Sequence, residues 1–205
     1  MRADVEIVWD IPETPPGLAG RVERFMGPGK SRSESAVETA GLIACGLLLA
    51  AGLWASGAWR GWSGAQCAVV ALVGLDLIGG VLTNATNAAK RWYHRPGPGV
   101  GRARMLFVSA HLIHLVAMGL IVLSGDWRWT SVNAALLLAG AAMVEFAPLH
   151  LKRPVSMSVL MVAVLINLFW LEVPALLGWF APLFFLKLLV CHLVPEAPLE
   201  RRRRV

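Results

Sequence analysis

The sequence predicts an all-α membrane protein, a polytopic bundle of six transmembrane helices with an N-in/C-in orientation. The 205-residue chain is 57% hydrophobic and only 16% charged, and its mean hydropathy is +0.62. A soluble domain is about 45–50% apolar and about 25% charged, so lipid must cover the excess apolar surface. This composition sets aside secreted disulfide domains, disordered tails and ordinary nucleic-acid binders.

The apolar residues are gathered in stretches of about 18–25, each long enough to cross a hydrocarbon core of about 30 Å as a helix. Residues 1–38 precede them as a polar tail that lacks the apolar core of a cleaved signal peptide. Val5 to Trp9 is compatible with a short strand, and the prolines and glycines after it predict no further regular structure in this tail. Residues 196–205 form a basic tail. The transmembrane domain 39–195 contains six predicted helices, at 39–59, 65–89, 105–124, 131–149, 154–172 and 175–195.

Lysine and arginine decide the orientation, because cytoplasmic loops carry the excess of basic residues. Sixteen of them lie in the two tails and in the second and fourth loops, whereas the other loops hold only Arg60 and Arg128. Most tryptophans fall at the opposite helix ends, where the indole prefers the membrane–water boundary. We therefore expect a multi-pass protein of the cell membrane with both termini cytoplasmic. Its net charge of +6 then reflects topology, and its expected partners are membrane lipids, with no nucleic acid.

The second predicted helix carries ionisable and amide side chains, which are costly inside a membrane and indicate function. At 100° per residue, one face about 100° wide collects Asp76, Thr83, Asn84, Asn87, Arg91 and His94. Hydrogen bonds between helices explain the amides adequately. Asp76 is explained less well, since its carboxylate needs a partner or a proton near mid-membrane. A functional site and a packing role are weighed equally for this face.

The third predicted helix carries His111 and His114, which are neighbours on one helical face at i, i+3. All five histidines fall in the predicted cytoplasmic leaflet, which favours one convergent polar centre. The predicted metal ligands are His111, His114 and His192. The candidates for a further ligand or a catalytic general base are Asp76, Glu145 and Glu196. The candidate substrate-binding residues are Asn84, Asn87, Arg91 and Arg95, whose arginines are compatible with a phosphate head group but are also explained by orientation alone.

Imidazole and carboxylate ligands without thiolate suit zinc, iron or manganese. The leading hypothesis is a metal-dependent membrane enzyme that acts on a lipid or isoprenoid substrate from the cytoplasmic leaflet. A small ion or solute transporter is an alternative, with Asp76, Asn84, Asn87 and Asn167 along a polar path. A haem-binding electron carrier that pairs His111 or His114 with His192 is another. The fourth alternative is a scaffold whose histidines are all structural.

Overall fold

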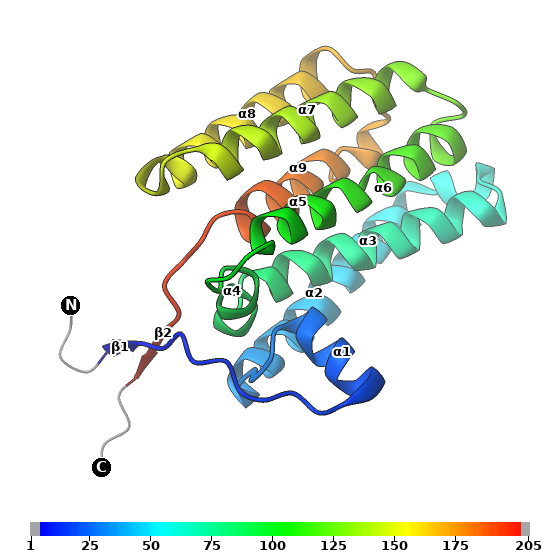
Figure 1. Cartoon of the computed structure of the whole chain (residues 1–205). Coiled ribbons are helices and arrows are strands. Elements are labelled where there is room, and N and C mark those ends of the chain that lie inside the picture. The colour runs from blue at the N-terminus through cyan, green and yellow to red at the C-terminus, as the bar shows by residue number, and fades with distance from the viewer. Residues whose placement is uncertain (1–4, 202–205) are drawn as a thin grey trace.

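A computed structural model describes residues 5–201 of the chain, which are 74% helical. Six helical segments are long and apolar enough to cross a membrane. They lie side by side in a bundle, with the first and last described segments together at one end (Figure 1). The all-α class and the six candidate spans are therefore confirmed. The first four residues and most of the arginine run of the predicted C-terminal tail lie outside the described residues.

The candidate spans include two irregular ones. The third consists of α5, α6 and η2, and the sixth consists of η4, α9 and η5; η2 and η5 are π-helical. In chain order the elements are β1 (Val5–Ile7), α1 (Gly17–Met26), α2 (Arg32–Ser56), η1 (Ala58–Gly61), α3 (Gly64–Asn84), α4 (Asn87–Tyr93), α5 (Val100–Ala110), α6 (Leu112–Ala117), η2 (Met118–Val122), α7 (Trp127–Phe146), η3 (Leu149–Leu151), α8 (Lys152–Phe169), η4 (Ala175–Leu177), α9 (Phe180–Phe185), η5 (Leu186–His192) and β2 (Leu199–Arg201).

Capping boxes begin the first two long helices. Ser31 accepts a hydrogen bond from the backbone N–H of Glu34, whose side chain accepts one from the Ser31 N–H. Ser63 and Gln66 repeat the arrangement at the start of α3. Each box satisfies two backbone donors that a helix start leaves free. The first candidate span, α2, consequently begins at Arg32, whereas hydropathy predicted its start at residue 39.

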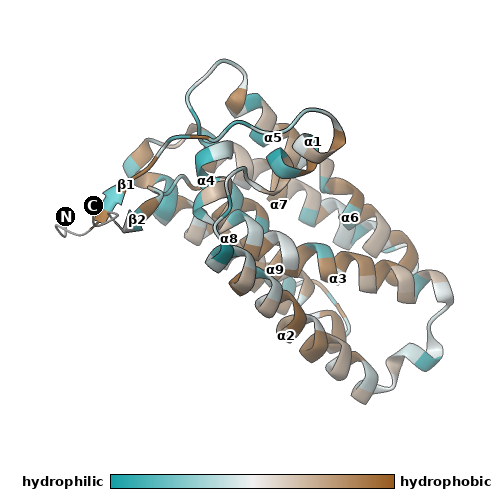
Figure 2. Ribbon diagram, turned by 90° about the horizontal axis from the view of Figure 1, so that it is seen from below, coloured by the Kyte–Doolittle hydropathy of each residue, from teal (hydrophilic) through white to brown (hydrophobic). Residues whose placement is uncertain are grey.

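Helix α3 lies at the centre of the fold, against α2 on one side and against η2, α9 and η5 on the others. Helix α2 packs mainly on α3, and no residue of the described α2 is buried, so its apolar side chains face the surroundings. Polar residues gather at the end of the bundle that carries α1, α4 and the sheet, whereas the long helices are largely apolar (Figure 2). This distribution is typical of helices that contact lipid along their length.

The two tails contain regular structure, of which the sequence predicted only the first strand. Strand β1 falls within the expected 5–9 segment, and it pairs antiparallel with β2, so both ends of the chain lie on the same side of the bundle. An even number of membrane crossings places both chain ends on one side of a membrane, so the pairing of β1 with β2 is consistent with six spans. The expectation of no regular structure after β1 was wrong, because α1 forms between Pro16 and Gly27. Its apolar side chains Leu18, Val22 and Phe25 recur at helical spacing, a signal that the surrounding prolines and glycines concealed.

Candidate metal centre

Asp76 of α3 meets the two histidines of the third span near the middle of the bundle. The His114 Nε2 atom lies 2.9 Å from Asp76 Oδ2, and the His111 Nε2 atom lies 3.9 Å from the same oxygen. One ligand atom from each of the three residues lies within 4.8 Å of the other two. Two nitrogens and one carboxylate oxygen thus converge closely enough to hold a metal ion. The predicted partnership of His111 with His114 is present, and Asp76 joins it.

The histidine pair sits where the third span loses regular α-geometry. His111 separates α5 from α6, and its backbone N–H bonds to the Val108 carbonyl three residues earlier, which tightens the turn. The two imidazole rings stack with centroids 4.9 Å apart. His111 Nδ1 lies 2.7 Å from the Phe107 carbonyl, so this nitrogen carries the proton and donates it. In the neutral ring the lone pair is then at Nε2, the atom that faces Asp76.

Lys187 completes the centre from η5. Its Nζ lies 2.5 Å from Asp76 Oδ2 and 3.3 Å from the Asp76 carbonyl oxygen, and its side chain is only 2% exposed. Gly80 makes room for it, because a Cβ at position 80 would lie 2.2 Å from Lys187 Cε. Lys187 is not among the site residues predicted from the sequence, although it lies within the sixth predicted helix, 175–195. The signal that could have found it is the one applied to Asp76, since a buried ammonium also requires a partner.

Asp76 is accessible from a side pocket. Its side chain is 41% exposed, although it lies in the middle of a candidate membrane-spanning helix. The pocket has about 580 Å³ of empty space. Its lining comes from α1, α2, α3, α4, α5 and η5, namely Phe25, Met26, Glu38, Leu42, Leu75, Asp76, Gly79, Gly80, Thr83, Asn84, Tyr93, Phe107 and Lys187. A molecule in this side pocket can therefore reach the carboxylate and the ammonium.

His192 does not belong to the metal group, although the sequence predicted it as a third histidine ligand. The ring of Phe107 stacks on His192 at 4.2 Å and lies 4.6 Å from the His111 ring, and it thus separates the two histidines. His192 Nδ1 instead lies 3.4 Å from Asn84 Oδ1. The haem alternative requires His192 to lie close to His111 or His114. The structure does not bring these residues together.

The other two predicted carboxylates lie in separate ion pairs. Glu145 Oε1 is 2.5 Å from the Arg104 guanidinium, and the Lys152 ammonium is 3.9 Å from Oε2. Glu196 lies 3.6 Å from Arg153 and 3.9 Å from the ammonium of Lys90. Glu145 joins α5, α7 and α8, and Glu196 lies beside the start of α8. Neither joins the metal group. These contacts explain both residues as structural.

The polar face predicted for the second span is divided, because α3 ends at Asn84 and α4 begins at Asn87. The Asn87 amide donates to the Leu199 carbonyl at 2.9 Å, and Arg91 Nη1 lies 2.5 Å from Glu200 Oε1. Both contacts fasten α4 to β2. Asn84 alone of the four predicted substrate-binding residues lines the side pocket. The guanidinium of Arg95, the fourth, lies 3.8 Å from the centre of the Trp92 ring.

Two basic residues of α4 and its C-cap hold the end of η5. The ammonium of Lys90 donates to the carbonyls of Cys191 and Val194 at 2.6 and 2.7 Å, and burial lowers its pKa. His94 Nε2 lies 2.9 Å from the His192 carbonyl and donates to it. Burial, with the positive charges of Lys90 and Arg104 nearby, lowers the pKa of His94 to about 3. The neutral His94 therefore acts as a hydrogen-bond donor in the folded protein.

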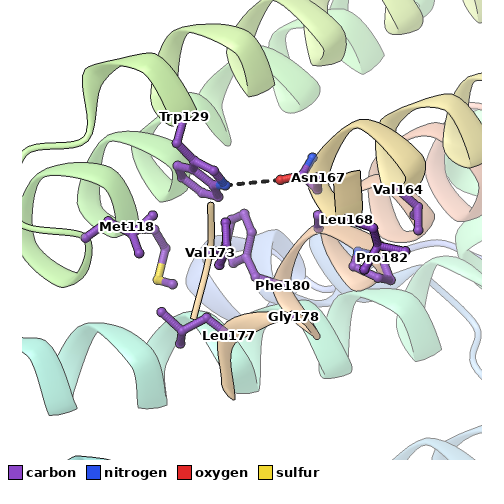
Figure 3. A pocket seen from close by; sticks show the side chains of 12 residues that line it. Met118, Trp129, Val164, Asn167, Leu168, Val173, Leu177, Gly178, Phe180 and Pro182 are labelled. Atoms are coloured by element: carbon purple, nitrogen blue, oxygen red, sulfur yellow. Dashed lines mark hydrogen bonds between the residues drawn. The ribbon is translucent and has the colours of Figure 1, made fainter. Parts of the chain in front are cut away.

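The opposite half of the bundle contains a second pocket of about 390 Å³, with a largely apolar lining (Figure 3). The Trp129 indole donates to Asn167 Oδ1 at 3.1 Å across it. Asn133 and Asn167 exchange amide hydrogen bonds of 3.2 and 2.8 Å between α7 and α8. Trp129 is only 2% exposed, so it is a core residue and not the boundary anchor that the sequence indicated. These groups satisfy one another and do not extend the polar centre.

Searches against protein-family models, curated proteins and solved structures found no match to this chain. The function of the centre therefore has to be inferred from its own chemistry.

Proposed function

We propose that this chain is a multi-pass membrane enzyme that binds one divalent transition metal ion at Asp76, His111 and His114 and acts on a lipid or isoprenoid substrate. The observation that carries the proposal is the approach of three ligand atoms to within 4.8 Å of one another. The side pocket gives a substrate access to this group from among the membrane helices.

The residues fit a metal ion in their chemistry. Two imidazoles and one carboxylate suit zinc, iron or manganese, and three protein ligands leave coordination positions open. His111 already makes the outer hydrogen bond that metal-ligating histidines usually make, from Nδ1 to a backbone carbonyl. His114 Nδ1 is buried without a hydrogen-bond partner among the described residues. When bound, zinc in such a set supplies a water molecule whose pKa is near neutrality.

Lys187 sets the charge balance of this centre. Its ammonium neutralises Asp76 while no ion is bound, and a divalent ion has to compete with it for the carboxylate. Since the imidazoles and the carboxylate bind metal in their deprotonated forms, we expect metal affinity to increase with pH. The flexible lysine stem allows the ammonium to turn to the other carboxylate oxygen or to a substrate oxygen. Lys187 is then a positioning residue for substrate.

Metal analysis of protein purified without a histidine tag tests the proposal. We expect about one equivalent of zinc, iron or manganese in the wild type and its loss in the His111→Ala/His114→Ala variant, which should still insert. His150→Ala is the matched control, because His150 is exposed and outside the group. Retention of stoichiometric metal by the double variant, or equal loss in the control, would contradict the assignment.

A proton-coupled transporter is the second candidate, favoured by the ion pair between Asp76 and Lys187 inside the membrane-spanning region. Such pairs recur in proton relays. Flux measurements in reconstituted vesicles distinguish the two functions. Transport is supported if metal-free protein carries a flux driven by a pH gradient and Asp76→Asn abolishes that flux. The mutual hydrogen bonds of Trp129, Asn133 and Asn167 favour the enzyme, since they close the other half of the bundle.

The distribution of basic residues supports an N-in/C-in orientation in the cell membrane, and this orientation is part of the proposal. In a cysteine-free background, a cysteine beside Arg128 should react with a membrane-impermeant reagent added outside intact cells. A cysteine beside Arg102 should react only after the membrane is opened. The reverse pattern would move the metal group to the outer half of the membrane.

A further inference from the structure

We infer that the side pocket binds the head of an uncharged, single-chain amphiphile, a long-chain alcohol or its ester, beside Asp76 and Lys187. This inference rests on the proposed function and names the class of substrate for the same site. It follows from three properties of the pocket: apolar walls that reach the lipid-facing side of the bundle, a polar floor, and carboxylates that already have cationic partners.

The walls of the side pocket are apolar and reach the outside of the bundle. Phe25 and Met26 come from α1, Leu42 from α2 and Phe107 from α5. Leu75, beside Asp76 on α3, is 53% exposed. Since the described α2 has no buried residue, the surface next to this opening is an apolar helix face of the kind that contacts acyl chains. A hydrocarbon chain can therefore lie along the opening while its head enters the pocket.

The floor offers both kinds of hydrogen-bonding group. The Asp76 carboxylate accepts hydrogen bonds, and the Lys187 ammonium donates them. A hydroxyl group can donate to the first and accept from the second, and an ester carbonyl can accept from the second. The pocket therefore fits a small head with an oxygen that reaches the ion pair.

Without a bound metal ion, the charged groups of the pocket neutralise one another, so a charged head finds no counter-charge there. Asp76 pairs with Lys187, and Glu38 pairs with Lys30 and also accepts a hydrogen bond from Thr83. Taking an unpaired phosphate or ammonium group out of water costs several kcal/mol. The pocket consequently favours an uncharged head over both.

The arginines predicted to hold a phosphate head lie elsewhere. Arg91 pairs with Glu200 and donates to the Gly29 carbonyl, and Arg95 stacks on Trp92. Neither arginine lines the side pocket. The interpretation of these residues as a phosphate site is therefore replaced by one in which they stabilise the fold around α4.

Photocrosslinking tests the inference on the full-length protein in detergent. The probe is a 16-carbon alcohol with a diazirine near its hydroxyl end, and the competitors are the unlabelled alcohol and its phosphate monoester. We expect crosslinks on α1 and α3, and we expect the alcohol to compete at least tenfold better than the phosphate. Metal content is measured in the same samples.

Two glycine variants locate the binding site. Gly79 lines the pocket, and a Cβ there meets only Leu42 at 3.8 Å, so Gly79→Leu should fill the pocket and reduce crosslinking at least tenfold. Gly52→Leu makes the same change on the exposed side of α2, where nothing lies within 4 Å, and should leave crosslinking unchanged. Met26→Trp narrows the pocket from α1 and replaces Gly79→Leu if that variant does not fold.

The outcomes separate this inference from the proposed function. Equal or better competition by the phosphate in chelator-treated protein, or crosslinking that survives both pocket variants, would overturn the inference whether or not the purified protein holds metal. If the alcohol binds and Gly79→Leu abolishes its binding, the inference holds, whether or not the wild type contains metal. The metal measurement then decides the proposed function independently.

Discussion

Removing Asp76 should destabilise the protein much more than removing its partner Lys187, because the two charges are buried to different extents. The lysine side chain is 2% exposed and the aspartate side chain 41%. In metal-free protein, Asp76→Asn leaves the buried ammonium without a counter-charge, which costs about 3–5 kcal/mol. Lys187→Met leaves a less buried carboxylate that still accepts a hydrogen bond from His114 at 2.9 Å, and we expect a smaller cost of about 1 kcal/mol, that of one lost hydrogen bond.

The double variant Asp76→Asn/Lys187→Met should be about as stable as Lys187→Met alone. The loss of the ammonium removes the cause of the larger penalty, so the two substitutions are coupled by about 3–5 kcal/mol, the full cost of Asp76→Asn. The fluorescence of the nine tryptophans reports unfolding in a denaturing detergent titration with a chelator present. Asp10→Asn, in the exposed part of the tail, is the control for the same chemical change.

Two results would refute this reasoning. One is equal destabilisation by Asp76→Asn and Lys187→Met, since unequal burial then has no energetic effect. The other is a double variant as unstable as Asp76→Asn, because the unpaired ammonium would then not be the cause of the loss.

Three further predictions concern other parts of the bundle. The pKa of His94 is about 3 in the folded protein and near 6.5 in the unfolded chain, so the unfolded chain binds one more proton at pH values between the two. The contribution of His94 to stability should therefore be complete above pH 6.5 and fall by about 1.4 kcal/mol per pH unit below it. Unfolding measured as a function of pH checks this, and His94→Gln should reduce the slope. Asn167→Ala should cost about 1–2 kcal/mol in detergent unfolding, because it leaves the Asn133 amide oxygen and the Trp129 indole N–H without a partner. Asn133→Ala should cost less, because Asn167 then still accepts the hydrogen bond of that indole. Gly80→Ala should displace Lys187 from Asp76 and strengthen metal binding, because that ammonium competes with the ion for the carboxylate. Gly79→Ala, whose Cβ has ordinary contacts, should leave metal binding unchanged, and calorimetric titration with zinc measures both.

The spans could be predicted from the sequence because their signal is local. A run of apolar residues long enough to cross a bilayer is visible without knowledge of any neighbouring helix. The same holds for His111 and His114, which are three residues apart on one helix. The capping box at Ser31 was also readable, but hydropathy alone places the start of that helix later.

The partners of the polar residues could not be predicted, because they depend on which helices are adjacent. Asp76 and Lys187 are 111 residues apart in the chain, and their contact requires that η5 pack against α3. The absence of His192 from the metal group has the same cause. His192 lies at the end of the sixth candidate span, but the ring of Phe107 contacts both it and His111, and position along a helix does not determine which side chain lies between two others.

The irregular geometry around Asp76 bears on whether its polar neighbours serve function or packing. His111 interrupts the third span, η5 is π-helical where it carries Lys187, and Gly80 lacks the side chain that would occupy the space of that lysine. A helix break, a π-helical segment and a mid-helix glycine each cost stability relative to a regular helix, and π-helical segments occur frequently at functional sites. All three bring a group to the same carboxylate. Apolar side chains would fill this space in regular helices at lower cost, so a packing role leaves these departures unexplained, whereas the proposed metal and substrate centre accounts for them.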